Sequence, residues 1–177
     1  MAALLAKWYS SPDLVKQREF VLQHAAVRKG EHVLDIGSGP GYLAKDIAEK
    51  VGPHGLVYGI DISDDMVKLA QDNCSDYPWA QFAIGDACAL RHPANQLFDC
   101  IISTQVYEYV SDISTALSEA FKLLKPGGRL IILDTDFDSV VWKTSNRERM
   151  SQILKAYDAH LVHPHLPQDL PAALAST

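Results

Sequence analysis

The stretch that decides the fold reads Val33-Leu34-Asp35-Ile36-Gly37-Ser38-Gly39-Pro40-Gly41-Tyr42. Its apolar start predicts a buried β-strand, and the glycines that follow predict a tight turn. Glycine permits φ > 0 and leaves room for a ligand against the backbone. A helix predicted from Tyr42 to about Val51 would offer unpaired N–H groups and the positive end of its dipole at the turn. The stretch therefore predicts a cradle for a cofactor.

The rest of the chain alternates predicted strands and helices. A helix is expected to begin at Ser10-Ser11-Pro12-Asp13 and to close at Gly30, and Lys125-Pro126-Gly127-Gly128 is expected to stop a later helix. No period is visible in the tail from His163. The strands are predicted at residues 32–36, 56–61, 79–84, 98–103 and 129–134, and the other helices at about 64–73, 111–124 and 150–161. Such alternation predicts right-handed crossovers and a parallel sheet covered on both faces.

Composition limits the classes of protein that fit. The 177 residues suit one domain, and 47% apolar with 21% charged residues is ordinary for a globular protein. The 16 basic and 22 acidic residues give a net charge of −6, which argues against a nucleic-acid or membrane partner. Cys74, Cys88 and Cys100 lack the spacing of metal ligands, and the apolar run at Met1–Lys7 is too short for a signal peptide. A cytoplasmic location is therefore expected.

Acidic residues stand at or just after the carboxyl ends of three of the predicted strands, where ligands bind in open α/β sheets. Gly39-x-Gly41-x-x-Ala44 with Asp61 would also fit a dinucleotide fingerprint, so NAD stays open on the glycines alone. A carboxylate at Asp35, inside the cradle, would repel a pyrophosphate and attract an ammonium or sulfonium group. Asp61 could accept from ribose hydroxyls, and Asp86 from an adenine amino group. This arrangement favours a cationic adenosyl ligand.

Five segments resemble, in order, the motifs of class I S-adenosylmethionine-dependent methyltransferases, and most closely the small-molecule branch that includes ubiquinone/menaquinone C-methyltransferases. The segments are Val33–Gly41, Tyr58–Ser63, Gly85–Ala87, Phe98–Ser103 and Leu124–Gly128. The resemblance covers about residues 30–135. It implies an α/β fold, a Rossmann-like, doubly wound, mostly parallel sheet with strand order 3-2-1-4-5. It also implies methyl transfer from S-adenosyl-L-methionine to a small-molecule acceptor.

The resemblance assigns parts of the cofactor to residues of this chain. The methionine end is implied to lie on Asp35 and the glycine loop, the ribose on Asp61, and the adenine on Asp86 and Ala87. Thr104 and Gln105 follow the fourth strand and could contact the cofactor there. The expected cofactor-binding residues are Asp35, Gly37, Ser38, Gly39, Asp61, Ile62, Met66, Asp86, Ala87, Thr104 and Gln105.

Catalytic residues are harder to choose, because in-line methyl transfer needs close approach and water exclusion more than an elaborate catalytic set. Tyr107, Glu108 and Tyr109 are candidates for acceptor contact or proton removal, with packing as the alternative.

Two interpretations are open for each of several other residues near the predicted site. Arg18 could reach a carboxylate or snorkel at the surface, and Trp8 and Tyr9 could fold over the cofactor or pack in the core. No metal is expected, because His163 and its neighbours His160 and His165 have no ligand spacing and suit a solvated tail.

The sequence departs from the family after the fifth strand. The family's sheet has seven strands, whereas no strand-like run follows Leu133, so the C-terminal β-hairpin is expected to be absent. The predicted parts are an N-terminal helical segment (1–30), a cofactor-binding core (31–135), and a C-terminal helix and tail (136–177). A truncated product or a homodimer covering the exposed edge would account for the difference. A non-catalytic S-adenosylmethionine-binding module and an NAD-dependent oxidoreductase remain as alternative functions.

Overall fold

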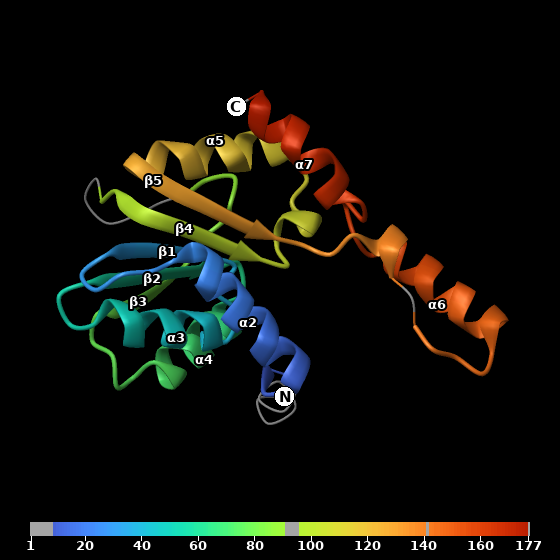
Figure 1. The fold of residues 1–177 in the computed structure, drawn as a ribbon, viewed down its shortest axis with the longest axis horizontal. Coiled ribbons are helices and arrows are strands. Elements are labelled where there is room, and N and C mark those ends of the chain that lie inside the picture. Colours follow the sequence, from blue (N-terminus) through green and yellow to red (C-terminus); the bar gives the residue numbers. More distant parts are fainter. Residues whose placement is uncertain (1–8, 91–95, 141, 177) are drawn as a thin grey trace.

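The computed structural model describes residues 9–90, 96–140 and 142–176, so Trp8 and the segment Met1–Lys7 lie outside it. Its centre is one five-stranded sheet in which every neighbouring pair is parallel, in the order β3-β2-β1-β4-β5 (Figure 1). The strands are β1 (His32–Ile36), β2 (Leu56–Asp61), β3 (Ala80–Ile84), β4 (Phe98–Thr104) and β5 (Leu124–Leu133). The predicted doubly wound fold and strand order are confirmed.

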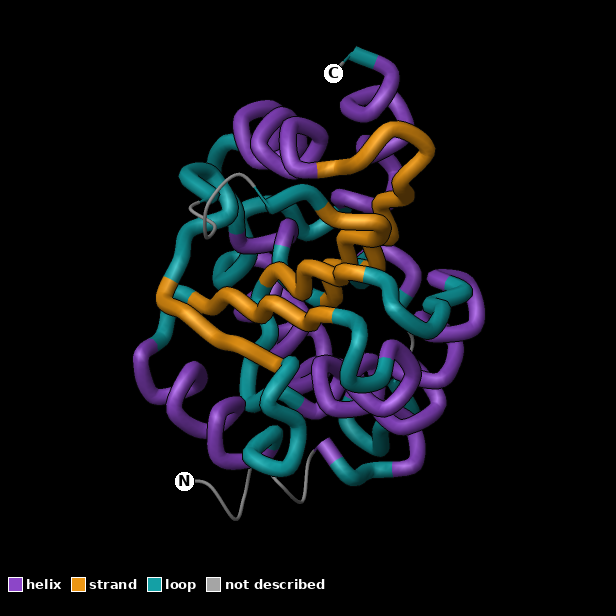
Figure 2. The backbone as a smooth tube through the Cα atoms, turned by 90° about the vertical axis from the view of Figure 1, so that its left-hand side faces the viewer, coloured by secondary structure: helices purple, strands orange, loops and turns teal. Residues whose placement is uncertain are grey.

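Helices cover both faces of this sheet, as Figures 1 and 2 show. The helices are α2 (Pro12–Ala25), α3 (Tyr42–Val51), α4 (Asp64–Asn73), α5 (Ile113–Leu123), α6 (Arg147–Asp158) and α7 (Leu166–Ala175), with 3₁₀ turns at Tyr107–Tyr109 and Phe137–Ser139. Helices α2, α3 and α4 lie on one face, and α5 and α7 on the other.

Alternate residues of the central strands supply two separate cores. Val33 of β1 packs with α2 and α3, whereas Leu34 and Ile36 pack with α5. The same alternation in β4 points Ile102 toward α3 and Ile101 toward α5. Burial on both sides explains why these strands read as continuous apolar runs in the sequence. The glycine turn after β1 is thereby held at the carboxyl edge of a rigid sheet.

The start of the last strand differs from its prediction. β5 begins at Leu124, which pairs with Phe98, and pairing resumes at Arg129 opposite Cys100. The residues expected to stop the preceding helix, 125–128, thus form an irregularity inside the strand, where Gly127 has a φ of +78°. Lys125 bonds Asp99 at 2.7 Å across this irregularity. The glycines interrupt the ladder without ending it.

The expectation of an irregular tail from His163 is wrong, because helix α7 spans most of it. Leu166 is buried, and Leu170 and Leu174 follow at helical spacing in the same core as α5. Pro167 occupies the first turn, where its missing N–H is not needed, and Pro171 loses one internal hydrogen bond. The two prolines therefore weaken the sequence signal of a helix that is stabilised by tertiary packing.

Smaller differences concern helix ends. Helix α2 ends at Ala25, with Ala26 in the left-handed conformation at its C-cap, and does not run to Gly30. Helix α6 ends at Asp158, so Leu161 packs from the following turn. No strand follows Leu133 among the described residues, and none of the described helices is long and apolar enough to cross a bilayer. The division into three parts stays a prediction.

Candidate functional site

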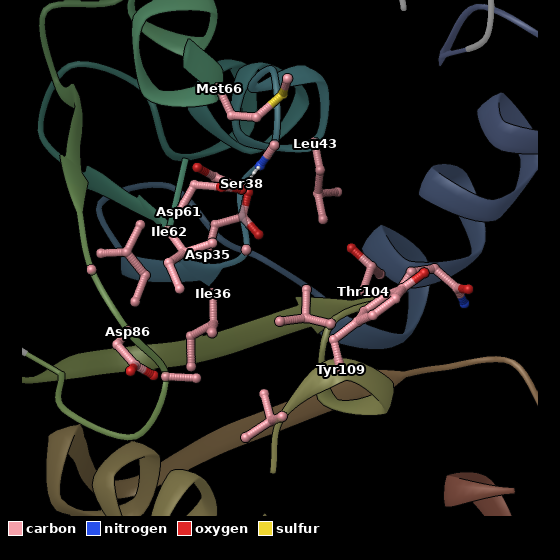
Figure 3. A pocket seen from close by; sticks show the side chains of 18 of the residues that line it. Asp35, Ile36, Ser38, Leu43, Asp61, Ile62, Met66, Asp86, Thr104 and Tyr109 are labelled. Carbon is pink, nitrogen blue, oxygen red and sulfur yellow. Dashed lines mark hydrogen bonds between the residues drawn. The ribbon is translucent and has the colours of Figure 1, made fainter. Parts of the chain in front are cut away.

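A cavity of about 840 Å³ opens at the carboxyl edge of the sheet (Figure 3). Its volume lies within the roughly 300–1,000 Å³ typical of small-molecule sites. Every residue predicted to bind the cofactor lines this one cavity. They are Asp35, Gly37, Ser38, Gly39, Asp61, Ile62, Met66, Asp86, Ala87, Thr104 and Gln105. Their convergence follows from the parallel strands, whose carboxyl ends share one edge.

The glycine loop after β1 is shaped by close contacts. Gly37 has a φ of +73°, and a Cβ on it would lie 2.2 Å from Cγ2 of Val106. Gly41 has a φ of +82°, and its Cβ would lie 2.8 Å from Cα of Ala70. Both positions therefore need glycine for conformation and for space. The loop is consequently pressed between the turn after β4 and helix α4.

Most amides of this loop are bonded within the protein. The N–H groups of Gly37 and Ser38 both donate to the carbonyl of Ile60 at 2.8 Å, and that of Gly39 donates to Oδ2 of Asp61 at 2.9 Å. The loop therefore contributes mainly backbone to the cavity wall, and side-chain carboxylates supply the negative charge of the site.

Asp35 is the most unusual group in the cavity. It is 1% exposed, and neither carboxylate oxygen has a hydrogen-bond partner among the described residues. Burial, and secondarily the charge of Asp61, raises the pKa of Asp35 to about 7. A buried carboxylate without partners is costly unless a ligand supplies a positive charge or hydrogen-bond donors. The site therefore calls for a cationic group beside Asp35.

The other two acids stand at the ends of β2 and β3 (Figure 3). Asp61 is held in place by the Gly39 amide on one oxygen and by the Ser63 amide, at 2.9 Å, on the other. Asp86 accepts from the amide of Cys88 through Oδ1 at 2.9 Å. Between them Ile62 is 78% exposed, which is unusual for isoleucine and suits a surface that a ligand ring would cover.

The first described residues cover the glycine loop. The ring of Tyr9 stacks on Tyr42 with centroids 5.4 Å apart, and the Tyr9 hydroxyl would lie 3.3 Å from a Cβ on Gly39. Arg18 donates to the carbonyl of Tyr9 at 2.7 Å and pairs with Asp46 at 3.0 Å. The reading in which Tyr9 folds over the cradle therefore agrees with its position. Arg18 lines the cavity too, but its charge is already paired.

The turn after β4 forms the opposite wall. Gln105 has a φ of +57°, and its side-chain carbonyl accepts from the hydroxyl of Thr135 at 2.8 Å. Asp134 accepts from the Val106 amide through Oδ1 at 2.9 Å, and this amide and those of Tyr107 and Glu108 favour its charged form. Burial raises the pKa of Asp134 to about 6 despite these bonds. Asp134 thus fixes the turn that carries the candidate catalytic residues.

Of the three catalytic candidates, only Tyr109 lines the cavity. Tyr107 and Glu108 are buried at 0% and 2% exposure and do not belong to the lining, whereas Tyr109 is 46% exposed. Glu108 accepts from the Thr135 amide at 3.3 Å. Burial and then the charge of Asp134 raise the pKa of Glu108. Tyr107 and Glu108 therefore lie buried outside the cavity lining, and the role of all three residues stays a prediction.

Several lining residues had no signal of their own in the sequence. Cys88 directly follows Ala87, and Val110, Ser111 and Asp112 directly follow Tyr109, so extending the motifs by a few residues would have found them. Leu14 and Gln17 come from α2, and only the packing of that helix brings them to the cavity.

The histidines of the C-terminal region do not form a solvated tail. His163 and His165 are half-buried, and exposed His160 packs edge-on against Tyr109 at 5.8 Å. Nδ1 of His165 lies 3.3 Å from Asp138 and 3.7 Å from Asp136, the spacing of a histidine–carboxylate ion pair. These atoms are also close enough to hold a metal ion, so the expected absence of a metal stays a prediction.

Comparison with known proteins places this architecture in a family. A methyltransferase domain model matches residues 27–169. The ubiquinone/menaquinone biosynthesis C-methyltransferase UbiE of Serratia proteamaculans is 33% identical over 149 residues, which are 82% of this chain and 55% of that protein. An uncharacterized 37.1 kDa protein in a Streptomyces fradiae transposon is 33% identical over 144 residues, covering 81% and 40%. The chain thus spans about half the length of the curated relatives it matches.

Solved structures share the fold. A putative methyltransferase from Bacillus halodurans superposes with a TM-score of 0.73 at 21% identity, covering 91% of this chain and 68% of that one. Phosphoethanolamine N-methyltransferase 2 of Haemonchus contortus, solved with S-adenosyl-L-methionine, gives 0.70 at 23% identity, covering 91% and 36%. Together with the domain match, the strand order and the motif-bearing cavity, these likenesses establish that the chain belongs to the class I S-adenosylmethionine-dependent methyltransferases.

Proposed function

We propose that this chain binds S-adenosylmethionine in the 840 Å³ cavity and transfers its methyl group to a small organic acceptor. The observation that carries the proposal is Asp35, a fully buried carboxylate with two unpartnered oxygens on the cavity wall. The methionine part of the cofactor offers an ammonium and a sulfonium, which match that need. When bound, S-adenosylmethionine supplies a methyl group activated for in-line displacement.

Each part of the wall has a role in this proposal. Asp35 compensates the positive charge of the cofactor, and Asp61, held rigid by two backbone amides, accepts from the ribose hydroxyls. Ile62 and Met66 flank the adenine, and Asp86 with Ala87 contacts its edge. Thr104, Gln105 and Tyr109 border the space left for the acceptor and exclude water from it.

The acceptor side supports a small, largely uncharged substrate. Leu14, Val106, Val110 and Tyr109 line it, and the positive charge of Arg18 is taken up by Asp46. A net charge of −6 disfavours nucleic-acid substrates. Several curated relatives are named as ubiquinone/menaquinone biosynthesis C-methyltransferases, so an aromatic or quinol-like acceptor is the first class to assay.

A non-catalytic cofactor-binding module is the second candidate function. It is favoured by the absence of Tyr107 and Glu108 from the cavity lining, which leaves Tyr109 alone among the predicted acid–base candidates. The oxidoreductase alternative is wrong, because the domain match places the chain among the methyltransferases.

Isothermal titration tests the cofactor directly. We expect saturable binding of S-adenosylmethionine and of its demethylated product, and none of NAD; the reverse result would reject the proposal. Transfer of labelled methyl groups to a metabolite extract or to a set of quinols would then separate the enzyme from the non-catalytic module. Binding without transfer to any acceptor would favour the module.

Two further proposals concern the cellular location and the oligomeric state of the protein. A cytoplasmic location is supported by three cysteines that are all unpaired. A homodimer is supported by the open edge of β5, beside a 560 Å³ groove that Phe20, Phe121 and Leu170 help to line. Light scattering during size-exclusion chromatography would measure the dimer, and a monomeric mass at high concentration would reject it.

A further inference from the structure

Helix α6 stands apart from the rest of the protein. In Figure 1 it projects away from the sheet and its two helix layers, and none of the described helices or strands packs closely along it. No residue of α6 is buried. A helix of 12 residues with so few contacts to the sheet and the other helices is too short to be stable in water by itself. This isolation raises the question of what its apolar side contacts.

The large apolar residues of α6 form one stripe. At 3.6 residues per turn, they fall within about 100° of arc. They are Met150, Ile153, Leu154 and Tyr157. Arg147 and Arg149 fall immediately on either side of this arc, where long side chains can lie along an apolar surface and keep their charges in water. The stripe is therefore bordered by positive charge on both sides.

Aromatic residues extend the stripe at one end. Trp142 contacts Tyr157 edge-on at 5.9 Å, and Phe137 stacks on the same ring at 5.6 Å. Trp142, Ile153 and Tyr157 are 45%, 38% and 41% exposed. Tryptophan and tyrosine are the side chains that favour the boundary between water and lipid. We call Trp142, Ile153, Tyr157 and the two flanking arginines the α6 patch.

The charge of this region opposes that of the whole chain. Between Trp142 and Asp158 there are four basic residues (Lys143, Arg147, Arg149, Lys155) and two acidic ones (Glu148, Asp158), whereas the chain carries −6. The net charge of the whole chain disfavours an anionic surface as a partner, but this segment carries two more basic than acidic residues, so we expect such a surface to attract the protein through α6.

The area of the patch indicates which kind of partner it can bind. A stable protein–protein interface needs roughly 800 Å² from each side. Trp142 together with Ile153 and Tyr157 of α6, each less than half exposed, cannot supply that area. A bilayer surface needs no matching contour and combines shallow insertion with charge attraction. We propose that the α6 patch docks on an anionic phospholipid surface, with α6 lying in the plane of the headgroups.

Vesicle co-sedimentation of the full chain tests this proposal without any methyl acceptor. One set of vesicles is phosphatidylcholine alone, and the other is an equal mixture with phosphatidylglycerol. We expect binding to the mixed vesicles only, weakening as salt is added. Arg147→Gln and Arg149→Gln should each weaken binding about fivefold. Ile153→Asp should abolish it, and Trp142→Phe should remove the blue shift of fluorescence on binding.

Matched controls lie elsewhere on the surface. Lys68→Gln and Lys122→Gln remove the same charge from exposed sites, and Ile84→Ser removes an apolar group that is 60% exposed at the end of β3. These variants should bind vesicles like the unmodified chain. Circular dichroism should be unchanged by the α6 variants, because α6 has no buried residues.

Three results would overturn the proposal. The first is no sedimentation with either vesicle, and the second is equal binding to neutral and anionic vesicles. The third is equal loss of binding in the patch variants and the control variants. A dimer that dissociates on Ile153→Asp, without vesicle binding, would assign the patch to a second copy of the chain instead. None of these results bears on cofactor binding, so the proposed function is tested separately.

Discussion

Replacement of Asp35 by asparagine isolates the electrostatic cost of the cofactor site. Folding raises the pKa of this carboxyl from 3.8 to about 7, so between those pH values the unfolded chain is ionised at this position and the native protein is not. The native state therefore loses stability as pH rises from about 4 to about 7. At 1.36 kcal/mol per pKa unit, a shift of about three units amounts to at most about 4 kcal/mol.

Asparagine keeps the shape of the side chain and removes the charge. Asp35→Asn should match the unmodified chain in stability near pH 4 and exceed it increasingly up to pH 8, by a few kcal/mol, in the absence of ligand. Urea unfolding at a series of pH values measures this difference. A difference that does not change with pH would refute the reasoning, because it would mean that Asp35 is not a buried carboxyl with a raised pKa.

The same variant should lose affinity for the cofactor. Loss of one charged contact, worth about 1.5–3 kcal/mol, predicts roughly 10- to 100-fold weaker S-adenosylmethionine binding. At pH 6 the unmodified chain should release a proton on binding, because the cationic ligand favours ionised Asp35. Titration calorimetry in buffers of different ionisation enthalpy detects that release, which should vanish in Asp35→Asn. Equal affinity of the two proteins would show that Asp35 does not face the positive groups.

Two further predictions follow from close contacts and burial. Gly37→Ala should destabilise the fold by about 1–3 kcal/mol, because its Cβ would lie 2.2 Å from Val106 at a residue in the left-handed conformation. Val106→Ala in the same chain should restore part of the lost stability. Urea unfolding of the double variant measures this, and simple addition of the two losses would contradict the prediction. A thiol reagent at pH 8 should label Cys88 first, because Cys74 and Cys100 are buried and their pKa values are raised to about 11. S-adenosylmethionine should slow the labelling of Cys88, because this residue lines the cavity. Peptide mass spectrometry measures the three rates, and equal rates for all three thiols would contradict the prediction.

The sequence predicted those parts of the site that sit on strand ends. The pattern of strands was enough to place Asp35, Asp61 and Asp86 together, because parallel strands deliver their carboxyl ends to one edge. The choice among Tyr107, Glu108 and Tyr109 could not be made in that way. A 3₁₀ turn sends neighbouring side chains in different directions, and only the folded structure shows that Tyr109 is the one of the three that lines the cavity.

In the C-terminal region, too, the sequence alone did not predict the structure. Helix α7 contains two prolines and depends on its contact with α5, so its sequence lacks the usual signals of a helix.

By itself the sequence determined the strands of a parallel sheet and the glycine cradle, because these depend on local patterns of apolar residues and glycine along the chain, while the strand order was implied by the family resemblance. Only the tertiary structure decided that Asp35 is buried without a partner, that Tyr9 covers the cradle and that α6 stands unpacked. Burial and missing partners are properties of how distant segments meet, and no local pattern encodes them.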